Sequence, residues 1–399
     1  MPGPMSGVRV VELGLWVAGP AAGAILADWG ADVIKIEPPA GDPGRSFGQM
    51  LGGDVPYNPP FELDNRGKRS IVADLSRKEG LDVAHALLEG ADVLVTNVRP
   101  VGLGRLGLDP ASLLGQYPRL IYGLITGYGT EGSEASRAAY DIAAFWARSG
   151  LVSLLTPPGA EPVYQRGGMG DHGAAMTLAG AVSAALYARE RTGQGQLVST
   201  SLIRQGVYTI GFDLSVTLRF GVSIGTPTHA TMPNPLINCY RDSQSRWFWL
   251  VGLEADRHWP GLSRAVGHTE WTEDPRFATR KGRARNCGQL IDLLDQTFAT
   301  RTRQEWGQAF DSEDVWWAPV QDPEEVLADP QVRSAGAFVE VPDGEGVATL
   351  INTPADFAGS PNQVRSMPPE LGEHTDEILA ELGHDSASIA RLRQTGAVS

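Results

Sequence analysis

The sequence predicts an α/β protein, with a large domain built on a parallel sheet and a smaller α+β domain after it. In the first half of the chain, short segments rich in β-branched residues alternate with helix-like segments, as in repeated βαβ units. After about residue 220 the chain becomes rich in Gly, Pro and Thr and loses periodicity, which is typical of a linker. A length of 399 residues is sufficient for two or three domains with large cores.

The strands expected in the large domain are short runs rich in apolar, often β-branched residues. They are residues 8–13, 33–37, 70–75, 92–97, 120–126 and 197–202. Repetition of strand, helix and strand at this spacing indicates a Rossmann-like parallel sheet covered by helices.

The segments between these strands predict helices and one long loop. The small-residue run 21–29 is expected to be a helix, and the Pro- and Gly-rich segment 38–60 a loop. Ser76 and Glu79 have the spacing of a capping box, which predicts a helix directly after them. Residues 173–190 are nearly all small and apolar, which favours a buried helix packed closely against its neighbours.

The second half of the chain predicts a smaller domain and a tail. Residues 246–253 are strand-like and amphipathic segments follow them, while the tail contains strand-like runs at 337–341 and 347–351 and a helix at 375–382. The expected boundaries are a large α/β domain at 1–220, a linker at 221–235, a small α+β domain at 236–328, and a C-terminal segment at 329–399 that returns to the large domain.

Composition excludes several classes of protein. The chain carries 33 basic and 47 acidic side chains, and its net charge of −14 opposes binding to nucleic acid. Neither Cys239 nor Cys287 lies in a metal-like spacing, and the seven histidines form no paired motif, so no metal is expected. Without a signal-peptide pattern or an apolar run of about 18 residues, a cytoplasmic protein that does not enter a membrane is expected.

Two short motifs lack the context that their chemistry needs. Residues 102–107, GLGRLG, match a dinucleotide-binding pattern, but Pro100 separates them from the preceding strand and no acidic residue follows at the required distance. Ser223 lies in a GVSIG match to a nucleophile elbow, but Thr226 and Pro227 follow where a helix should begin. Neither motif therefore predicts a site.

A stronger candidate is Asp171, in the segment RGGMGDHG at residues 166–173. At the start of the next helix, the dipole and free amides would keep its carboxylate ionised and oriented. The glycines would let a thioester approach, and the amides could hold an oxyanion. Such an aspartate suits nucleophilic attack on an acyl carbon. The alternative is that Asp171 only caps the helix.

The sequence resembles the family III CoA-transferases, a group that includes formyl-CoA transferase, carnitine CoA-transferase and α-methylacyl-CoA racemase. The resemblance covers essentially the whole chain. Its landmarks are GVRVVEL at 7–13, AGP at 18–20, LADWGADVIKIE at 26–37, NRGKRSI at 65–71, ADVLVTNVRP at 91–100, RLGL at 105–108, GYG at 127–129, GD at 170–171, LADPQV at 327–332 and GEHTDEIL at 372–379.

The resemblance implies a CoA-transferase that moves CoA from an acyl-CoA to a carboxylic acid. Asp171 matches the aspartate that forms mixed anhydrides and an aspartyl-CoA thioester. CoA is then a substrate, and no covalently bound cofactor is implied. The matching CoA contacts are Val17, Ala18, Asn97, Val98, Arg99, Arg105 and Tyr140. The two arginines would supply cations for phosphates on an acidic protein. The resemblance also implies a homodimer of interlocked chains.

Departures from the family pattern narrow the activity. Tyr140 stands where the racemase branch carries a histidine base, and a tyrosine phenol, with an ordinary pKa of about 10, is a poor base at neutral pH. Glu254 matches the glutamate that accompanies that histidine, but it does not restore the pair. Pro38 stands where formyl-CoA transferase carries an arginine. The glycine-rich active-site loop of that enzyme also has no counterpart near residues 241–246. Both departures disfavour a formyl/oxalyl substrate pair. The alternatives are an acyl-CoA racemase or epimerase, a non-catalytic CoA-ester binding protein and, more distantly, a hydrolase.

Overall fold

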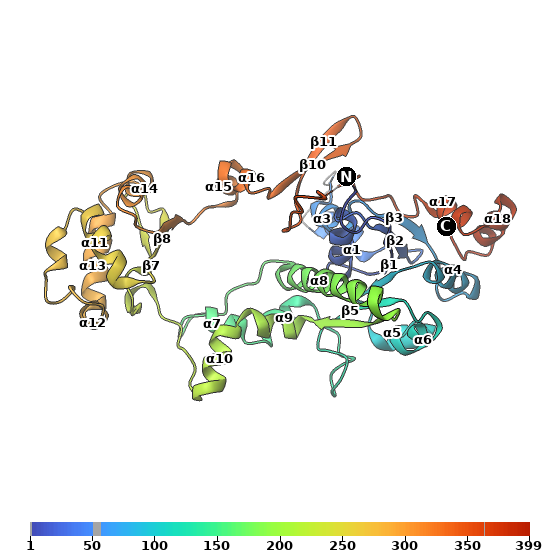
Figure 1. Ribbon diagram of the computed structural model, residues 1–399, viewed down its shortest axis with the longest axis horizontal. Coiled ribbons are helices and arrows are strands. Elements are labelled where there is room, and N and C mark those ends of the chain that lie inside the picture. The colour runs from blue at the N-terminus through green and yellow to red at the C-terminus, as the bar shows by residue number, and fades with distance from the viewer. Residues whose placement is uncertain (1, 51–56, 363) are drawn as a thin grey trace. The chain divides into compact units, whose positions relative to one another are not determined.

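The computed structural model describes residues 2–50, 57–362 and 364–399 and divides into two compact units (Figure 1). The first unit comprises the described residues of Met1–Ser153, Pro162–Ser223 and Ser334–Ser399. The second comprises Leu154–Glu161 and Ile224–Arg333. No helix in these described ranges combines the length and apolar character that crossing a bilayer requires.

The first unit is built on a six-stranded parallel sheet, which confirms the predicted Rossmann-like α/β class. Its strands are β1 (Arg9–Leu13), β2 (Asp32–Glu37), β3 (Arg69–Val72), β4 (Val93–Thr96), β5 (Ile121–Thr126) and β6 (Gln196–Ser201). They lie in the order β3-β2-β1-β4-β5-β6, and every neighbouring pair is parallel. Every residue of β4 and β5 is buried, because helices cover both faces of a parallel sheet.

Two long helices pack together over one part of the sheet. Helix α1 (Ala18–Asp28) contacts both α8 (Met169–Thr192) and the central strands, and α8 contacts β5 and β6. Every residue of α1 is buried, since its Ala- and Gly-rich sequence allows close approach from all sides. The N-termini of these two helices carry the candidate site.

A separate apolar cluster joins the sheet to other helices of the first unit. Helices α4 (Lys78–Glu89), α6 (Pro110–Gln116) and α17 (Thr375–Glu381) contribute buried side chains to it, including Leu87, Leu113 and Ile378. Helix α18 (Ser386–Gln394) adds partly buried residues to the same cluster. A hairpin of β10 (Phe338–Asp343) and β11 (Gly346–Ile351) precedes α17.

Two local expectations are wrong. The segment 38–60 is not simply a loop: it contains the turn η1 (Pro43–Ser46) and helix α2 (Phe47–Met50), while α3 (Pro59–Asn65) begins at its end. Asp42 accepts a hydrogen bond from the Gly44 amide at 2.8 Å and thereby starts η1. Residues 51–56 of the segment lie outside the described residues.

The predicted capping box also does not form. Helix α4 takes Arg77 as its N-cap, with no side-chain cap. The Ser76 hydroxyl instead donates to Asp74 Oδ1 at 2.6 Å, because a nearby carboxylate competes for it.

The two unsupported motifs adopt structures that fit neither chemistry. The GLGRLG residues lie in α5 (Pro100–Leu106) and end at its C-cap Gly107, instead of joining a strand to a helix. Ser223 follows helix α10 (Gly211–Phe220) and not a strand. The chain reaches α10 through α9 (Leu202–Thr209) and, earlier, through the π-helical turn η2 (Ile142–Ala147) and α7 (Leu151–Leu155).

The second unit has a three-stranded antiparallel sheet. Its strands are β7 (Ile237–Arg241), β8 (Trp247–Val251) and β9 (Trp317–Pro319), with β8 in the centre. The helices around it are α11 (Ala255–Ala265), α12 (Arg280–Arg285), α13 (Cys287–Phe298), α14 (Arg303–Ser312) and α15 (Pro323–Ala328), with α16 (Pro330–Ser334) at its end. The core is aromatic, with Trp259, Phe298 and Phe310 among its buried members.

Candidate functional site

The strand order of the first unit's sheet reverses between β1 and β4, which is a topological switch point. The chain adds β2 and β3 on one side of β1 and then places β4 and β5 on the other. At such a point the loops after neighbouring strands diverge and leave a crevice beyond their carboxyl ends, where ligands bind in this class of sheet. The loop after β1 contains Val17 and leads into Ala18 of α1, and the loop after β4 contains Asn97, Val98 and Arg99. The fold therefore brings these five predicted residues to one edge.

Asn97 ties the two loops together. Its Oδ1 accepts from the Leu15 amide at 2.9 Å, and its Nδ2 donates to the Leu15 carbonyl at 2.8 Å. A Cβ on Gly19 would lie only 2.7 Å from Asn97 Oδ1, so glycine at 19 makes room for this amide. The side chain of Asn97 thus shapes the crevice by holding backbone.

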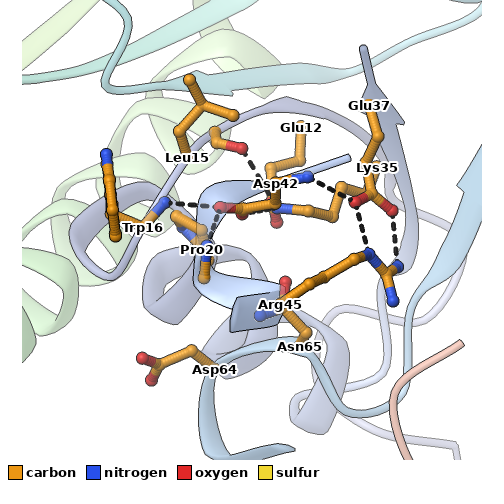
Figure 2. A network of polar contacts seen from close by, with 12 residues as sticks. Glu12, Leu15, Trp16, Pro20, Lys35, Glu37, Asp42, Arg45, Asp64 and Asn65 are labelled. Atoms are coloured by element: carbon orange, nitrogen blue, oxygen red, sulfur yellow. Dashed lines mark hydrogen bonds and ion pairs between the residues drawn. The ribbon is translucent and has the colours of Figure 1, made fainter. Parts of the chain in front are cut away.

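A buried ion-pair network lies directly beneath the loop after β1 (Figure 2). Lys35 Nζ donates to Glu12 Oε1 at 2.8 Å, Asp42 Oδ2 at 2.8 Å and the Gly14 carbonyl at 3.0 Å. Burial opposes the charge of Lys35, but the carboxylates of Glu12 and Asp42 outweigh it and raise its pKa. Asp42 Oδ1 accepts from the amide of Trp16, whose φ of +65° is unusual for a residue other than glycine. The network therefore holds Trp16 in a left-handed backbone conformation that residues other than glycine rarely adopt.

The two remaining predicted CoA contacts, Arg105 and Tyr140, are both exposed. Arg99 and Arg105 are exposed at the two ends of α5, and within the described residues neither forms an ion pair. Tyr140 is 62% exposed, and its ring meets the edge of Trp16 with centroids 5.8 Å apart. Tyr140 therefore lies beside the loop after β1. Arg99 lies at the N-cap of α5 and Arg105 in its last turn.

Asp171 lies in the first turn of α8 but does not cap it. The N-cap is Gly168, at a φ of +78° and without a side-chain cap. Among the residues that the structure describes, none donates a hydrogen bond to the half-buried Asp171 carboxylate or pairs with it. The alternative of a capping role is therefore wrong, and the carboxylate is left available to a ligand.

The surroundings of Asp171 oppose the ionisation that its place at the helix start would favour. Burial, with the neighbouring carboxylates of Asp141 and Asp64, raises the pKa of Asp171 to about 7, although His172 opposes the shift. Desolvation and two like charges both disfavour the charged form of a carboxyl group. Near neutral pH, Asp171 is consequently in exchange between its acid and its carboxylate.

Asp141 comes to Asp171 from the start of η2. Its buried Oδ2 accepts from Gln165 Nε2 at 2.9 Å and from the Gly170 amide at 3.4 Å. A Cβ on Gly170 would lie 2.4 Å from the Phe145 ring, so this glycine lets η2 and α8 approach closely. The side-chain amide of Gln165 therefore holds the Asp141 carboxylate in place beside Asp171.

Asp64 reaches the same place from α3. Its buried Oδ1 lies 3.0 Å from His172 Nε2. Burial raises the pKa of Asp64, and His172 opposes that shift, while Asp64 is the main partner that raises the pKa of His172 against burial. The carboxylates and the imidazole form one coupled cluster: Asp64, Asp141, Asp171 and His172.

Sequence reasoning missed Asp64, Asp141, Gln165 and His172 as members of the site. Their separation along the chain, from α3 to η2 and α8, conceals the cluster, although the adjacency of Asp171 and His172 was a visible signal.

Glu254 lies in the second unit, where it pairs with Arg257 at 2.7 Å. In the described ranges no group of three or more His, Cys, Asp or Glu side chains is arranged to hold a metal ion.

Known proteins resemble this chain over nearly its full length. The sequence model of CoA-transferase family III matches residues 5–375. The (R)-2-hydroxy-4-methylpentanoate CoA-transferase of Clostridioides difficile is 30% identical, with 99% of each chain covered. The cinnamoyl-CoA:phenyllactate CoA-transferase of Clostridium sporogenes is 33% identical over 98% of this chain and 96% of that one.

Solved structures agree with the sequence relatives. A CAIB/BAIF family protein from Brucella suis superposes with a TM-score of 0.84 at 32% identity, covering 96% of this chain and 100% of that one. Rv3272 from M. tuberculosis gives a TM-score of 0.83 at 29% identity, covering 94% and 99%. The likeness therefore extends through both units of the chain.

Proposed function

The chain belongs to CoA-transferase family III, and on that premise we propose that it moves CoA from an acyl-CoA to a carboxylic acid, with Asp171 carrying CoA between them. The observation that carries the proposal is the state of the Asp171 carboxylate. It is accessible, has no partner in the described part of the chain, and has a pKa of about 7. A carboxylate of raised pKa is a better nucleophile, once ionised, than an ordinary aspartate.

The proposed reaction uses one carboxylate in four exchanges. Asp171 attacks the acyl-CoA carbonyl, the C–S bond breaks, and an aspartyl acyl anhydride and CoA thiolate result. The thiolate attacks the aspartyl carbonyl, which gives an aspartyl-CoA thioester and releases the donor acid. The acceptor carboxylate then attacks the aspartyl-CoA carbonyl, the C–S bond breaks, and a second anhydride and CoA thiolate result. This thiolate attacks the acceptor's carbonyl and displaces the Asp171 carboxylate. The acceptor leaves as its CoA thioester, and Asp171 is restored.

We place CoA in the crevice beyond β1 and β4. Val17, Ala18, Asn97 and Val98 would line it, and Tyr140 would border it. Arg99 and Arg105 supply positive charge on a protein with a net charge of −14, which a ligand bearing several phosphates requires. The unpaired state of both arginines within the described ranges supports this placement.

The relatives suggest the first acceptors to test. Two of them, at 30% and 33% identity, are named for (R)-2-hydroxy-4-methylpentanoate and for phenyllactate, which are both 2-hydroxy acids. We therefore propose a 2-hydroxy carboxylate as the acceptor class. An assay of several acyl-CoA donors against 2-hydroxy acids, unsubstituted acids and dicarboxylic acids tests this assignment.

We also propose that the protein acts as a homodimer, interlocked as the family resemblance implies. Helix α10 buries none of its side chains within the chain. Large apolar side chains on α9 and α10 are 72% to 88% exposed: Tyr208, Phe212, Leu218 and Phe220. An exposed apolar surface of this kind marks a contact with another molecule. Mass measurement in solution tests the assembly, and a monomer would contradict it.

The decisive experiment traps the carrier. Incubation with an acyl-CoA followed by hydroxylamine should convert Asp171 to a hydroxamate that mass spectrometry locates, and Asp171→Asn should abolish both the adduct and transfer. Tight CoA binding without an adduct would favour a non-catalytic binding protein. Deuterium exchange at the α-carbon without any acceptor acid would favour a racemase.

A further inference from the structure

His172 has one ring nitrogen anchored and the other free. Its Nε2 lies 3.0 Å from Asp64 Oδ1, and the Asp64 side chain is only 4% exposed, so the anchor belongs to the core. The His172 side chain itself is 43% exposed. No described residue hydrogen-bonds its Nδ1. Because the Asp64 carboxylate accepts, Nε2 carries a proton, and a second proton would sit on Nδ1.

Gly168 keeps the space beside this free nitrogen open. A Cβ on Gly168 would lie 3.1 Å from His172 Cε1 and 3.3 Å from Nδ1. The φ of +78° at Gly168 also favours glycine there. The approach to Nδ1 therefore lies along the glycine backbone at the start of α8, one residue before Met169 and three before Asp171.

The charges that face His172 favour its imidazolium form. Burial lowers the pKa of His172, but Asp64 on α3, Asp171 on α8 and Asp141 before η2 together raise it. Lys68 and Arg66 act on the Asp64 side of the pair, where they oppose the raised pKa of that carboxylate. Asp171 and His172 each shift the pKa of the other, so their charges interact. An imidazolium there can meet the negative charge that thioester exchange creates.

We propose that His172 contacts the CoA sulfur and passes a proton between Nδ1 and that sulfur in each exchange at Asp171. This inference rests on the proposed function. When Asp171 attacks the thioester, the C–S electron pair goes to sulfur, which takes the Nδ1 proton and leaves His172 neutral. When CoA attacks an anhydride, neutral Nδ1 takes the thiol proton back as the new C–S bond forms. Asp64 is the positioning residue that orients the ring.

The test compares wild type with His172→Gln across pH. Wild-type kcat should fall at alkaline pH as the imidazolium is lost. His172→Gln should lower kcat about 100-fold, the range of general acid–base catalysis, with little change in KM for acyl-CoA. It should also lose the alkaline limb and move the acid limb to higher pH, because the charge of His172 lowers the pKa of Asp171. His85→Gln is the matched control, since His85 bonds Tyr117 at 3.2 Å and belongs to another part of the unit.

A second variant guards against simple misfolding. Asp64→Asn keeps an acceptor for Nε2 but removes the charge, so the alkaline limb should move to lower pH. His172→Gln within twofold of wild type, or with an unchanged alkaline limb, would overturn the inference. Hydroxylamine trapping separates the two proposals: no adduct in wild type contradicts the carrier role of Asp171, whereas an adduct with an unaltered pH profile in His172→Gln contradicts only the role of His172.

Discussion

Asn97 holds Leu15 by both of its backbone groups, with hydrogen bonds of 2.9 Å and 2.8 Å across the point where the sheet changes direction. Asn97→Ala would leave the amide and the carbonyl of Leu15 without these partners. We expect a loss of about 1–3 kcal/mol in unfolding free energy and weaker CoA binding. Denaturant unfolding and calorimetric titration with CoA measure the two effects. Unaltered CoA affinity would show that the loop holds its shape without this amide.

Removal of Asp42 should destabilise the protein strongly. Asp42→Ala leaves the buried charge of Lys35 with one carboxylate fewer, and it removes the acceptor of the Trp16 amide. Breaking a buried pair on one side costs about 3–5 kcal/mol. Thermal unfolding provides the measurement. The matched control is Asp82→Ala, which removes the exposed pair with Lys78 at 2.6 Å and should change the melting temperature little.

The rate should rise with pH through the titration of Asp171. In the proposed mechanism the Asp171 carboxylate is the nucleophile, and its pKa of about 7 predicts that kcat/KM increases as pH passes neutrality. Because Asp141 raises that pKa, Asp141→Asn should move the midpoint to lower pH. A pH–rate profile of both proteins tests the direction, and a midpoint that moves upward would contradict the electrostatic account.

Asp171 should also reduce stability where it is ionised. Its pKa is higher in the folded protein than the ordinary value of 3.8, so the fold binds a proton more tightly than the unfolded chain does. Stability is therefore lost as pH rises from about 4 to about 7. We expect Asp171→Asn to melt at a higher temperature than wild type at pH 8 and at a similar temperature at pH 4. Equal melting temperatures at pH 8 would argue against the raised pKa.

The two arginines of α5 should govern CoA affinity and its response to salt. Loss of a charge-assisted contact costs about 1.5–3 kcal/mol, so Arg99→Ala with Arg105→Ala should weaken CoA binding by tenfold or more. The binding that remains should depend less on ionic strength. Titration with CoA at low and high salt measures this. Arg391→Ala, an exposed arginine of α18, is the control and should bind CoA normally.

The sheet could be predicted because buried parallel strands leave a clear trace in sequence. Runs such as Val93–Thr96 and Ile121–Thr126 are short and apolar, and helical segments separate them. The capping box at Ser76 was wrong because the Ser76 hydroxyl donates to Asp74, two residues before it, and does not accept from a backbone amide of the helix. The spacing of two residues does not predict a capping box when a third polar side chain nearby forms a hydrogen bond with one of them.

The position of Asp171 could be predicted, but its ionisation could not. A helix start and its glycines are visible in sequence, whereas Asp64 and Asp141 reach Asp171 only through the packing of α3 and η2 against α8. Those contacts depend on tertiary structure, and they set the pKa. The sequence shows that His172 follows Asp171, but it does not show that the imidazole contacts Asp64, 108 residues earlier.

The ion pairs of Lys35 with Glu12 and Asp42 are buried parts of the fold, so the base of the crevice is already formed before any ligand binds. Glu12 of β1 and Lys35 of β2 pair across the two strands, and Asp42 joins Lys35 to the backbone amide of Trp16 in the turn. A ligand entering there would meet a rigid, ready-made cradle and would lose little affinity to ordering it. On the proposed placement, CoA would remain bound in this crevice while the donor acid leaves and the acceptor acid enters.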